Sequence, residues 1–235
     1  SPVVMVRKKN GEMRFCVDYR ALNAKTKRDV YPLPRIDDIL SRLQGSKYFS
    51  TLDMTQGYWQ MRLKPEDRTK TAFTTRQGVW VFNVIPMGLC NAPSAFQRSM
   101  DAVLGEDIGD CCFVDLDDII VFSKTFEDHL RDLAKVVERL QARRLLIKLA
   151  KCKFAQKELL FLGHIVNAEG MKMNRELVKT ILEAKPPKNP EEVSRFLGIT
   201  NWYRAFIQDF ARTTEPLTRL LHKETRWTWG QEQQI

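Results

Sequence analysis

Short apolar runs, separated by Gly, Pro and Asn, predict a series of β-strands along this chain. Residues 3–6 and 13–19 form the first two runs, and the Asn10-Gly11 pair between them is a strong signal for a tight hairpin turn. The same pattern predicts strands at residues 48–53, 71–75, 79–84, 111–114 and 119–122. The last two runs flank four residues, which predicts a second tight hairpin.

Apolar residues that recur every three or four positions predict helices between these strands. One spans residues 36–43 and a second spans residues 92–104, and each is followed by a glycine that favours a helix end. A third begins after Thr125, which resembles the first residue of a capping box. A fourth begins after Asn189, with proline in its first turn.

The order of these elements predicts the fold class. Strands and helices are mixed without regular alternation, which favours an α+β architecture with an antiparallel sheet. The 235 residues suffice for one large domain or two small ones. Residues 185–190 contain three prolines and are expected to link the last helical segment to the rest.

Composition and charge narrow the function. Hydrophobic residues make up 43% of the chain and charged residues 29%, a balance typical of a globular protein with a real core. No run approaches the roughly 18 apolar residues that span a bilayer, and we predict no signal peptide and no membrane partner. Five cysteines without zinc spacing indicate reduced thiols in an intracellular protein. The net charge of +9 favours nucleic acid as partner.

Candidate chemistry concentrates at three aspartates. Asp53 ends an apolar strand, and Asp117 and Asp118 lie at the tip of the hairpin between residues 111 and 122. A hairpin tip beside a strand end can bring these carboxylates together, where a cation must neutralise their repulsion. Carboxylate oxygens suit Mg²⁺ or Mn²⁺, and two such ions ~4 Å apart serve phosphoryl transfer. The alternative is ordinary turn chemistry, because Asp is common in turns.

At these residues the sequence resembles the reverse transcriptases of gypsy-type long-terminal-repeat retrotransposons and, more distantly, those of retroviruses. The resemblance covers nearly the whole chain. Its segments occur in the family's order and at about its spacing: SPVVMVRKKNGEMRFCVDYRALN, YPLPRIDDIL, YFSTLDMTQGYWQ, KTAFTT, IPMGLCNAPSAFQ, VDLDDIIVFS, LLFLGHIV and RFLGITNWYRAFI. Eight collinear segments make the resemblance specific.

The resemblance implies a right-hand polymerase fold, with fingers at about residues 1–35 and 64–84 and the palm in the rest of residues 1–185. Residues 186–235 would begin the thumb, before an RNase H-like domain. It implies an RNA-directed DNA polymerase, a nucleotidyltransferase that adds dNTPs to a primer on an RNA or DNA template. It also implies adjacent RNase H and integrase domains of a polyprotein, and an intracellular location in a cytoplasmic retroelement particle or the nucleus.

The resemblance also implies roles for individual residues. Asp53, Asp117 and Asp118 would be the catalytic carboxylates that hold two Mg²⁺ ions, or Mn²⁺ in their place. For dNTP binding, the positions that match are Lys8 and Arg14 on the triphosphate, Tyr58 under the sugar and Met87 near the base. The alternatives are a solvated basic strand for Lys8 and a core position for Tyr58. Lys151 matches a lysine near the pyrophosphate, although Lys148 and Lys153 lie close by.

The sequence departs from the family at Asp115, where the family has an aromatic residue near the primer terminus. Asp115 adds a fourth acidic group beside the metals, which would repel the primer phosphates or recruit an extra cation. We therefore expect a weakened polymerase. Two other functions stay open: an inactive remnant that binds nucleic acid, which Asp115 favours, and a palm-type polymerase that makes RNA, which Tyr58 opposes by excluding a 2′-hydroxyl.

Overall fold

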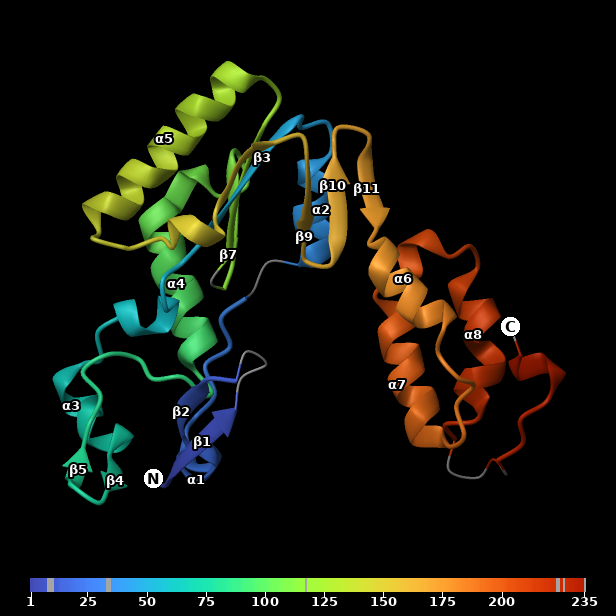
Figure 1. The fold of residues 1–235 in the computed structure, drawn as a ribbon, viewed down its shortest axis with the longest axis horizontal. Coiled ribbons are helices and arrows are strands. Elements are labelled where there is room, and N and C mark those ends of the chain that lie inside the picture. The colour runs from blue at the N-terminus through green and yellow to red at the C-terminus, as the bar shows by residue number, and fades with distance from the viewer. Residues whose placement is uncertain (8–10, 33–34, 117, 223–224, 226, 235) are drawn as a thin grey trace. The chain divides into compact units, whose positions relative to one another are not determined.

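The computed structural model describes residues 1–7, 11–32, 35–116, 118–222, 225 and 227–234. Contacts divide the chain into two units: residues 1–159 with 166–170, and residues 160–165 with 171–235. Figure 1 shows the ribbon of both units and labels their elements. Within the described parts of the chain, no helix is both long enough and apolar enough to cross a bilayer.

The first unit is built around a four-stranded sheet with the strand order β6-β7-β3-β8. Its members are β3 (Tyr48–Asp53), β6 (Cys112–Asp115), β7 (Asp118–Ser123) and β8 (Lys153–Gln156), and all three pairings are antiparallel. The strand β3 has the bounds that the sequence predicts. This sheet confirms the predicted α+β class with an antiparallel sheet.

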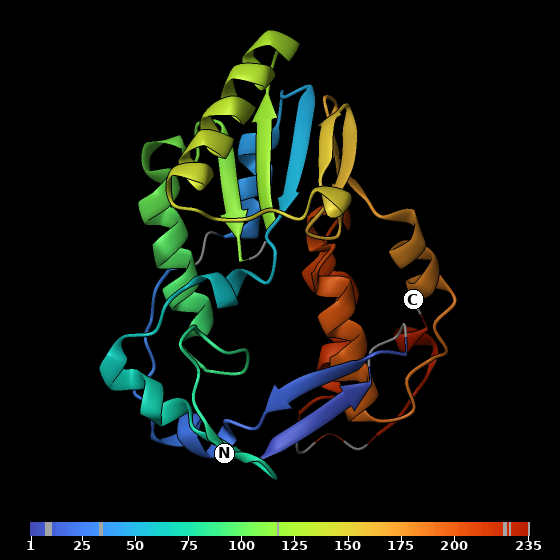
Figure 2. The same ribbon diagram turned by 60° about the vertical axis from the view of Figure 1, so that its left-hand side comes forward.

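Helices cover both sides of this sheet. Figures 1 and 2 show α4 (Ala92–Leu104) and α5 (Phe126–Ala142) on one side of β3 and β7, and α2 (Ile36–Leu43) on the other. Alternation along each strand places Leu52, Val114 and Ile119 on the face toward α4 and α5, where they join one buried core. The Thr125 side chain accepts a hydrogen bond from the Asp128 backbone, which confirms the predicted cap of α5.

Smaller elements complete this unit. An antiparallel hairpin joins β1 (Val3–Arg7) to β2 (Met13–Val17), and a second joins β4 (Phe73–Thr75) to β5 (Gly78–Trp80). The expected strands at 71–75 and 79–84 are thus too long, because residues 69–71 form a 3₁₀ turn and only residues 78–80 continue the ladder. Two short helices, α1 (Arg20–Lys25) and α3 (Pro65–Arg68), were not predicted.

The second unit is mainly helical. It contains α6 (Arg175–Leu182), α7 (Pro190–Asn201) and α8 (Phe210–Arg219), and residues of α7 and at the end of α8 form a core that includes Val193, Leu217 and Leu220. Asn189 caps α7 as predicted, because its side chain accepts from the Glu192 backbone. A separate three-stranded sheet with the order β11-β10-β9 is formed by β9 (Glu158–Phe161), β10 (His164–Asn167) and β11 (Gly170–Met173), and its residues are divided between the two units.

Candidate active site

Asp53 and Asp118 are directly opposite partners at the ends of β3 and β7. Opposed residues of an antiparallel pair have Cα atoms about 4.5–5.5 Å apart and side chains on the same face. The pairing therefore brings together two of the three predicted carboxylates, although 65 positions separate them in the chain. The third, Asp117, lies outside the described residues. Two carboxylates at this spacing repel each other unless a cation shares them.

Asp115 extends this pair into a row of three across neighbouring strands. It ends β6 and is the register partner of Asp118. The hairpin is therefore tighter than predicted, because Asp115 and Asp118 both belong to the strands, and Leu116 has a left-handed φ of 53°. Burial raises the pKa of the half-buried Asp115 carboxyl above its ordinary value. The row places acidic groups on one face at the end of the sheet.

Lys151 provides a positive charge at this end of the sheet. Its Nζ atom lies 2.9 Å from Oδ2 of Asp53, so the Asp53 carboxylate already accommodates a cation. Carboxylate oxygens are preferred ligands of Mg²⁺ and Mn²⁺, and the pair Asp53 and Asp118 fits a divalent ion by its chemistry. Among the described residues, which leave out Asp117, no group of three or more His, Cys, Asp and Glu side chains is arranged to hold a metal.

Tyr58 follows Asp53 on the 3₁₀ turn η1 (Gly57–Gln60). Its ring packs edge-on against Phe96 of α4, with ring centroids 5.4 Å apart. Phe96 belongs to the buried core, and Tyr58 is partly buried against it. The core therefore supports one side of the Tyr58 ring.

The remaining candidates lie on other elements. Met87 is 41% exposed in the loop before α4, and Asn23 of α1 holds this loop through both of its amide atoms. The Asn23 Nδ2 donates to the Gly88 carbonyl at 2.8 Å, and its Oδ1 accepts from the Cys90 backbone at 2.9 Å. Arg14 is exposed on β2, and Lys8 lies outside the described residues. Their roles with the nucleotide stay predictions.

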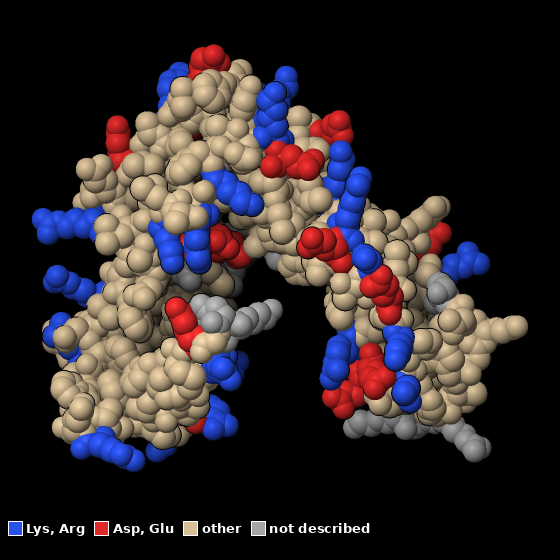
Figure 3. Space-filling view, viewed as in Figure 1, with Lys and Arg blue, Asp and Glu red and all other residues tan. Residues whose placement is uncertain are grey.

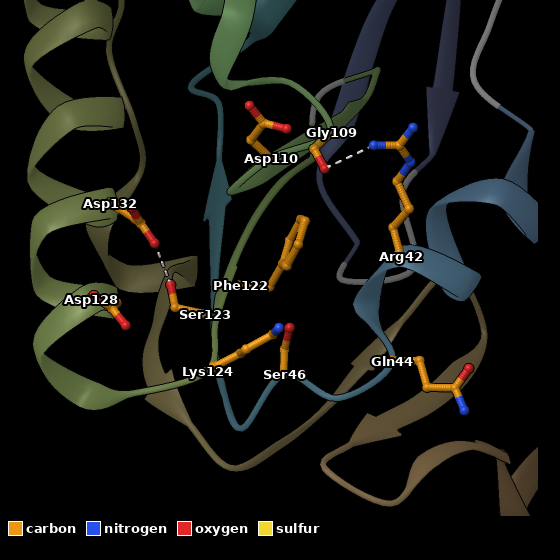
Figure 4. Close-up of a pocket in the computed structure, with 10 residues that line it drawn as sticks. All are labelled: Arg42, Gln44, Ser46, Gly109, Asp110, Phe122, Ser123, Lys124, Asp128 and Asp132. Atoms are coloured by element: carbon orange, nitrogen blue, oxygen red, sulfur yellow. Dashed lines mark hydrogen bonds between the residues drawn. The ribbon is translucent and has the colours of Figure 1, made fainter.

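A separate cavity of about 450 Å³ opens at the far end of the same strands (Figure 4). It is lined by Arg42, Gln44, Ser46, Gly109, Asp110, Phe122, Ser123, Lys124, Asp128 and Asp132. Figure 4 shows the Ser123 hydroxyl bonded to Asp132, and Arg42 bonded to the Gly109 carbonyl. Because Ser123 pairs with Tyr48 at the start of β3, this cavity and the carboxylate row lie at opposite ends of the β3–β7 pair.

Behind this cavity, His129 of α5 is fully buried and bonded on both ring nitrogens. The Ser123 hydroxyl donates to Asp132 at 2.6 Å, so it can only accept from Nδ1 of His129, 3.2 Å away. The Nε2 atom then accepts from the Ser50 hydroxyl at 2.7 Å, and Ser50 accepts from the Ala155 backbone. Burial lowers the pKa of His129, with an opposing effect from Asp132.

Sequence reasoning missed Asn23 and Gln60, two residues whose side chains bond to the backbone of segments near the candidate site. Both are amides inside segments that carry the family resemblance, and that placement is the only signal the sequence offers for them. Apart from Thr55, which precedes Gln60 by five positions, their partners are 65 to 86 positions away in the chain, so no local pattern could identify these contacts. Gln60 bonds to the backbone of Thr55 and Leu146.

Basic side chains are not confined to one part of the surface. Figure 3 shows Lys and Arg side chains over both units, with Asp and Glu among them. The net charge of +9 therefore supports a polyanionic partner without locating it.

Comparison with protein families matches residues 6–166 to the model described as reverse transcriptase (RNA-dependent DNA polymerase). The chain is 44% identical over 225 residues to the retrovirus-related Pol polyprotein from transposon opus of Drosophila melanogaster. It is 37% identical over 228 residues to the transposon Tf2-3 polyprotein of Schizosaccharomyces pombe. The two alignments cover 94% and 97% of this chain, but only 22% and 17% of those polyproteins. The chain thus spans about a fifth of their length.

Solved structures give the same result. A foamy viral protease–reverse transcriptase in complex with double-stranded DNA matches 99% of this chain with a TM-score of 0.89 and 28% identity. The foamy viral enzyme in complex with an RNA/DNA hybrid also matches 99% of the chain, with a TM-score of 0.82 and 27% identity. These matches cover 41% and 32% of the viral chains.

Proposed function

This chain belongs to the reverse transcriptase (RNA-dependent DNA polymerase) family, and we propose that it is the polymerase core of an enzyme that adds dNTPs to a primer 3′-hydroxyl. The observation that carries the proposal is the register of Asp53 with Asp118 at the ends of β3 and β7. Because the foamy viral relatives bind double-stranded DNA and an RNA/DNA hybrid, we propose the same partners here.

In the proposed mechanism, the three carboxylates bind the metal ions. Asp53, Asp117 and Asp118 would hold two Mg²⁺ ions, which when bound would lower the pKa of the primer 3′-hydroxyl and neutralise charge on the triphosphate. Without the ions, the Lys151 ammonium partly balances Asp53. The protein's remaining contribution is positioning, which is the main requirement of phosphoryl transfer.

The remaining residues would bind and select the nucleotide. Lys8 and Arg14 would contact the triphosphate, because ammonium and guanidinium groups complement phosphate oxygens. Met87 would lie near the base. The Tyr58 ring, supported from below by Phe96, would clash with a 2′-hydroxyl and so favour dNTPs over rNTPs.

We further propose that this segment acts within a polyprotein that also carries RNase H and integrase domains, in a cytoplasmic retroelement particle. The similarity to transposon and retrovirus-related polyproteins supports this context.

Primer extension on an RNA template, with and without Mg²⁺, tests the proposal. We expect extension with dNTPs that requires the metal and is abolished by Asp117→Asn. Extension with rNTPs at an equal rate would instead indicate a polymerase that makes RNA.

One observation favours a second function, a nucleic-acid-binding remnant without activity. Asp115 places a third acidic group in register with Asp118, where a primer phosphate would be repelled. Template-primer binding without any metal-dependent extension by the chain, together with extension recovered in its Asp115→Tyr variant, would support this second function.

A further inference from the structure

Gln60, the last residue of η1, makes three hydrogen bonds to backbone atoms. Its Nε2 donates to the carbonyls of Thr55 at 2.7 Å and Leu146 at 3.0 Å. Its Oε1 accepts from the backbone N–H of Leu146 at 2.7 Å. The amide thus binds Leu146 as a neighbouring strand would, through one donor and one acceptor. It also donates to Thr55, which precedes η1 in the chain.

The turn that Gln60 spans is conformationally unfavourable. Gln56, between Thr55 and Gly57, has a left-handed φ of 51°, a region that non-glycine residues seldom adopt. Such a backbone persists only where its surroundings hold it. Before Gln56 in the chain, residues 53–55 are paired with residues 146–148.

Three contacts form that pairing. The Lys148 N–H donates to the Asp53 carbonyl at 2.8 Å, and the Thr55 N–H donates to the Leu146 carbonyl at 2.9 Å. Met54 and Ile147 form an antiparallel bridge between them. The segment before the turn is therefore fixed to residues 146–148 by its own backbone, whereas η1 after the turn is fixed to Leu146 by the Gln60 side chain.

We propose that Gln60 is a positioning residue that sets the location of the Tyr58 ring relative to the Asp53 carboxylate. Asp53 lies before the strained turn and Tyr58 lies after it, and Gln60 fastens both sides to Leu146. The inference rests on the proposed function, in which Asp53 holds metal and Tyr58 excludes a 2′-hydroxyl on the nucleotide sugar. Gln60 touches no reacting atom and acts through Tyr58.

If Gln60 served only to stabilise the fold, its removal would change stability and not sugar selection. Gln60 and its partners are near the surface, where water can replace the lost bonds. Its removal should therefore change stability little, while a displaced Tyr58 ring should change sugar selection. Discrimination between dNTP and rNTP is thus the informative measurement.

The experiment compares Gln60→Met, which keeps the side-chain length but cannot form these bonds, with Asn189→Ala, which removes the cap of α7 in the other unit. Binding of dATP and of ATP is measured on the chain in complex with a template and a dideoxy-terminated primer, in the presence of Mg²⁺. We expect the preference for dATP to fall at least about fivefold in Gln60→Met and to stay unchanged in Asn189→Ala. The Leu146 amide, whose acceptor is lost, should exchange hydrogen faster in Gln60→Met only.

The outcomes separate this inference from the proposed function. Faster Leu146 exchange together with an unchanged preference for dATP would overturn the inference, because η1 would then move without effect on sugar selection. Unchanged exchange would overturn it as well, since Gln60 would not hold Leu146. A wild-type chain that prefers dATP but does not extend a normal primer would refute the proposed catalysis and leave the role of Gln60 supported.

Discussion

Toward one end of the β3–β7 pair, Ser50 and Ser123 share a fully buried histidine; at the other end, Asp53 and Asp118 face each other across the strands. The hydrogen bonds around His129 form a network that begins at the Ala155 backbone and ends at Asp132, and each donor in it has an acceptor. At the carboxylate end, acidic groups lie in a row, and the adjoining turns contain the left-handed residues Gln56 and Leu116.

Under the proposed function, the difference separates a region that stabilises the fold from a region that performs the chemistry. A satisfied buried network fixes one arrangement of helix and strands. Like charges in register and left-handed non-glycine residues cost stability, and they persist where function requires them. Strand alternation also puts the two regions on opposite faces of the sheet, because Ser50 and Asp53 are three residues apart. Substitutions at the carboxylate end should therefore lower activity and leave stability nearly unchanged, and substitutions of His129 should do the reverse.

The largest expected effect is on activity at the carboxylate end. Asp53→Asn should lower the rate of Mg²⁺-dependent primer extension by at least about 1000-fold, equivalent to about 4 kcal/mol of activation free energy. The free energy of unfolding should change by less than about 1 kcal/mol, because the Asp53–Lys151 pair is partly exposed to solvent. Single-turnover extension and urea denaturation measure the two quantities. Retained extension would remove Asp53 from the mechanism.

The next effect is on stability at the other end. His129→Ala should lower the free energy of unfolding by about 3 kcal/mol, because it leaves a cavity and two buried hydroxyls without their partner. Extension per folded molecule should be unchanged. The matched control is His222→Ala, since His222 is exposed and its loss should cost less than about 0.5 kcal/mol. Equal urea midpoints for the two variants would show that the network contributes no stability.

Asp115→Tyr makes the carboxylate row less acidic. We expect primer extension to rise severalfold, about 1 kcal/mol in activation free energy, because a half-buried acidic group beside the primer phosphates is removed. Steady-state extension on a fixed template-primer measures the change. Equal rates for the chain and its variant would show that Asp115 does not impair the enzyme.

The smallest effect is the pH dependence of stability. Because burial holds the pKa of His129 below its ordinary value of 6.5, the unfolded chain takes up a proton on this group before the folded chain does. The contribution of neutral His129 is therefore complete above about pH 6.5 and is lost as the pH falls below it. Urea denaturation at pH 7.5 and pH 5.5 should show a smaller decrease for His129→Gln than for the wild type. The same decrease in both would exclude this histidine as the cause.

Local signals predicted much of this framework. Strand β3 ends at Asp53 and helix α4 ends before Gly105, as their apolar patterns and the glycine indicated. The predicted hairpin loop was too long, because Asp115 and Asp118 look like turn residues in the sequence although they pair in the ladder. Strand pairing between distant segments is set by tertiary packing, so the bonds of Gln60 to Leu146 could not be predicted.

The central claim is that Asp53 and Asp118, with Asp117, hold divalent ions in contact with the nucleotide. Crystals of the chain with template-primer, dNTP and Mn²⁺ would locate those ions by anomalous scattering. We expect Mn²⁺ at coordination distance from carboxylate oxygens of these aspartates, with the Lys151 ammonium displaced from Asp53. Bound nucleotide with Mn²⁺ elsewhere, and Lys151 still on Asp53, would contradict it.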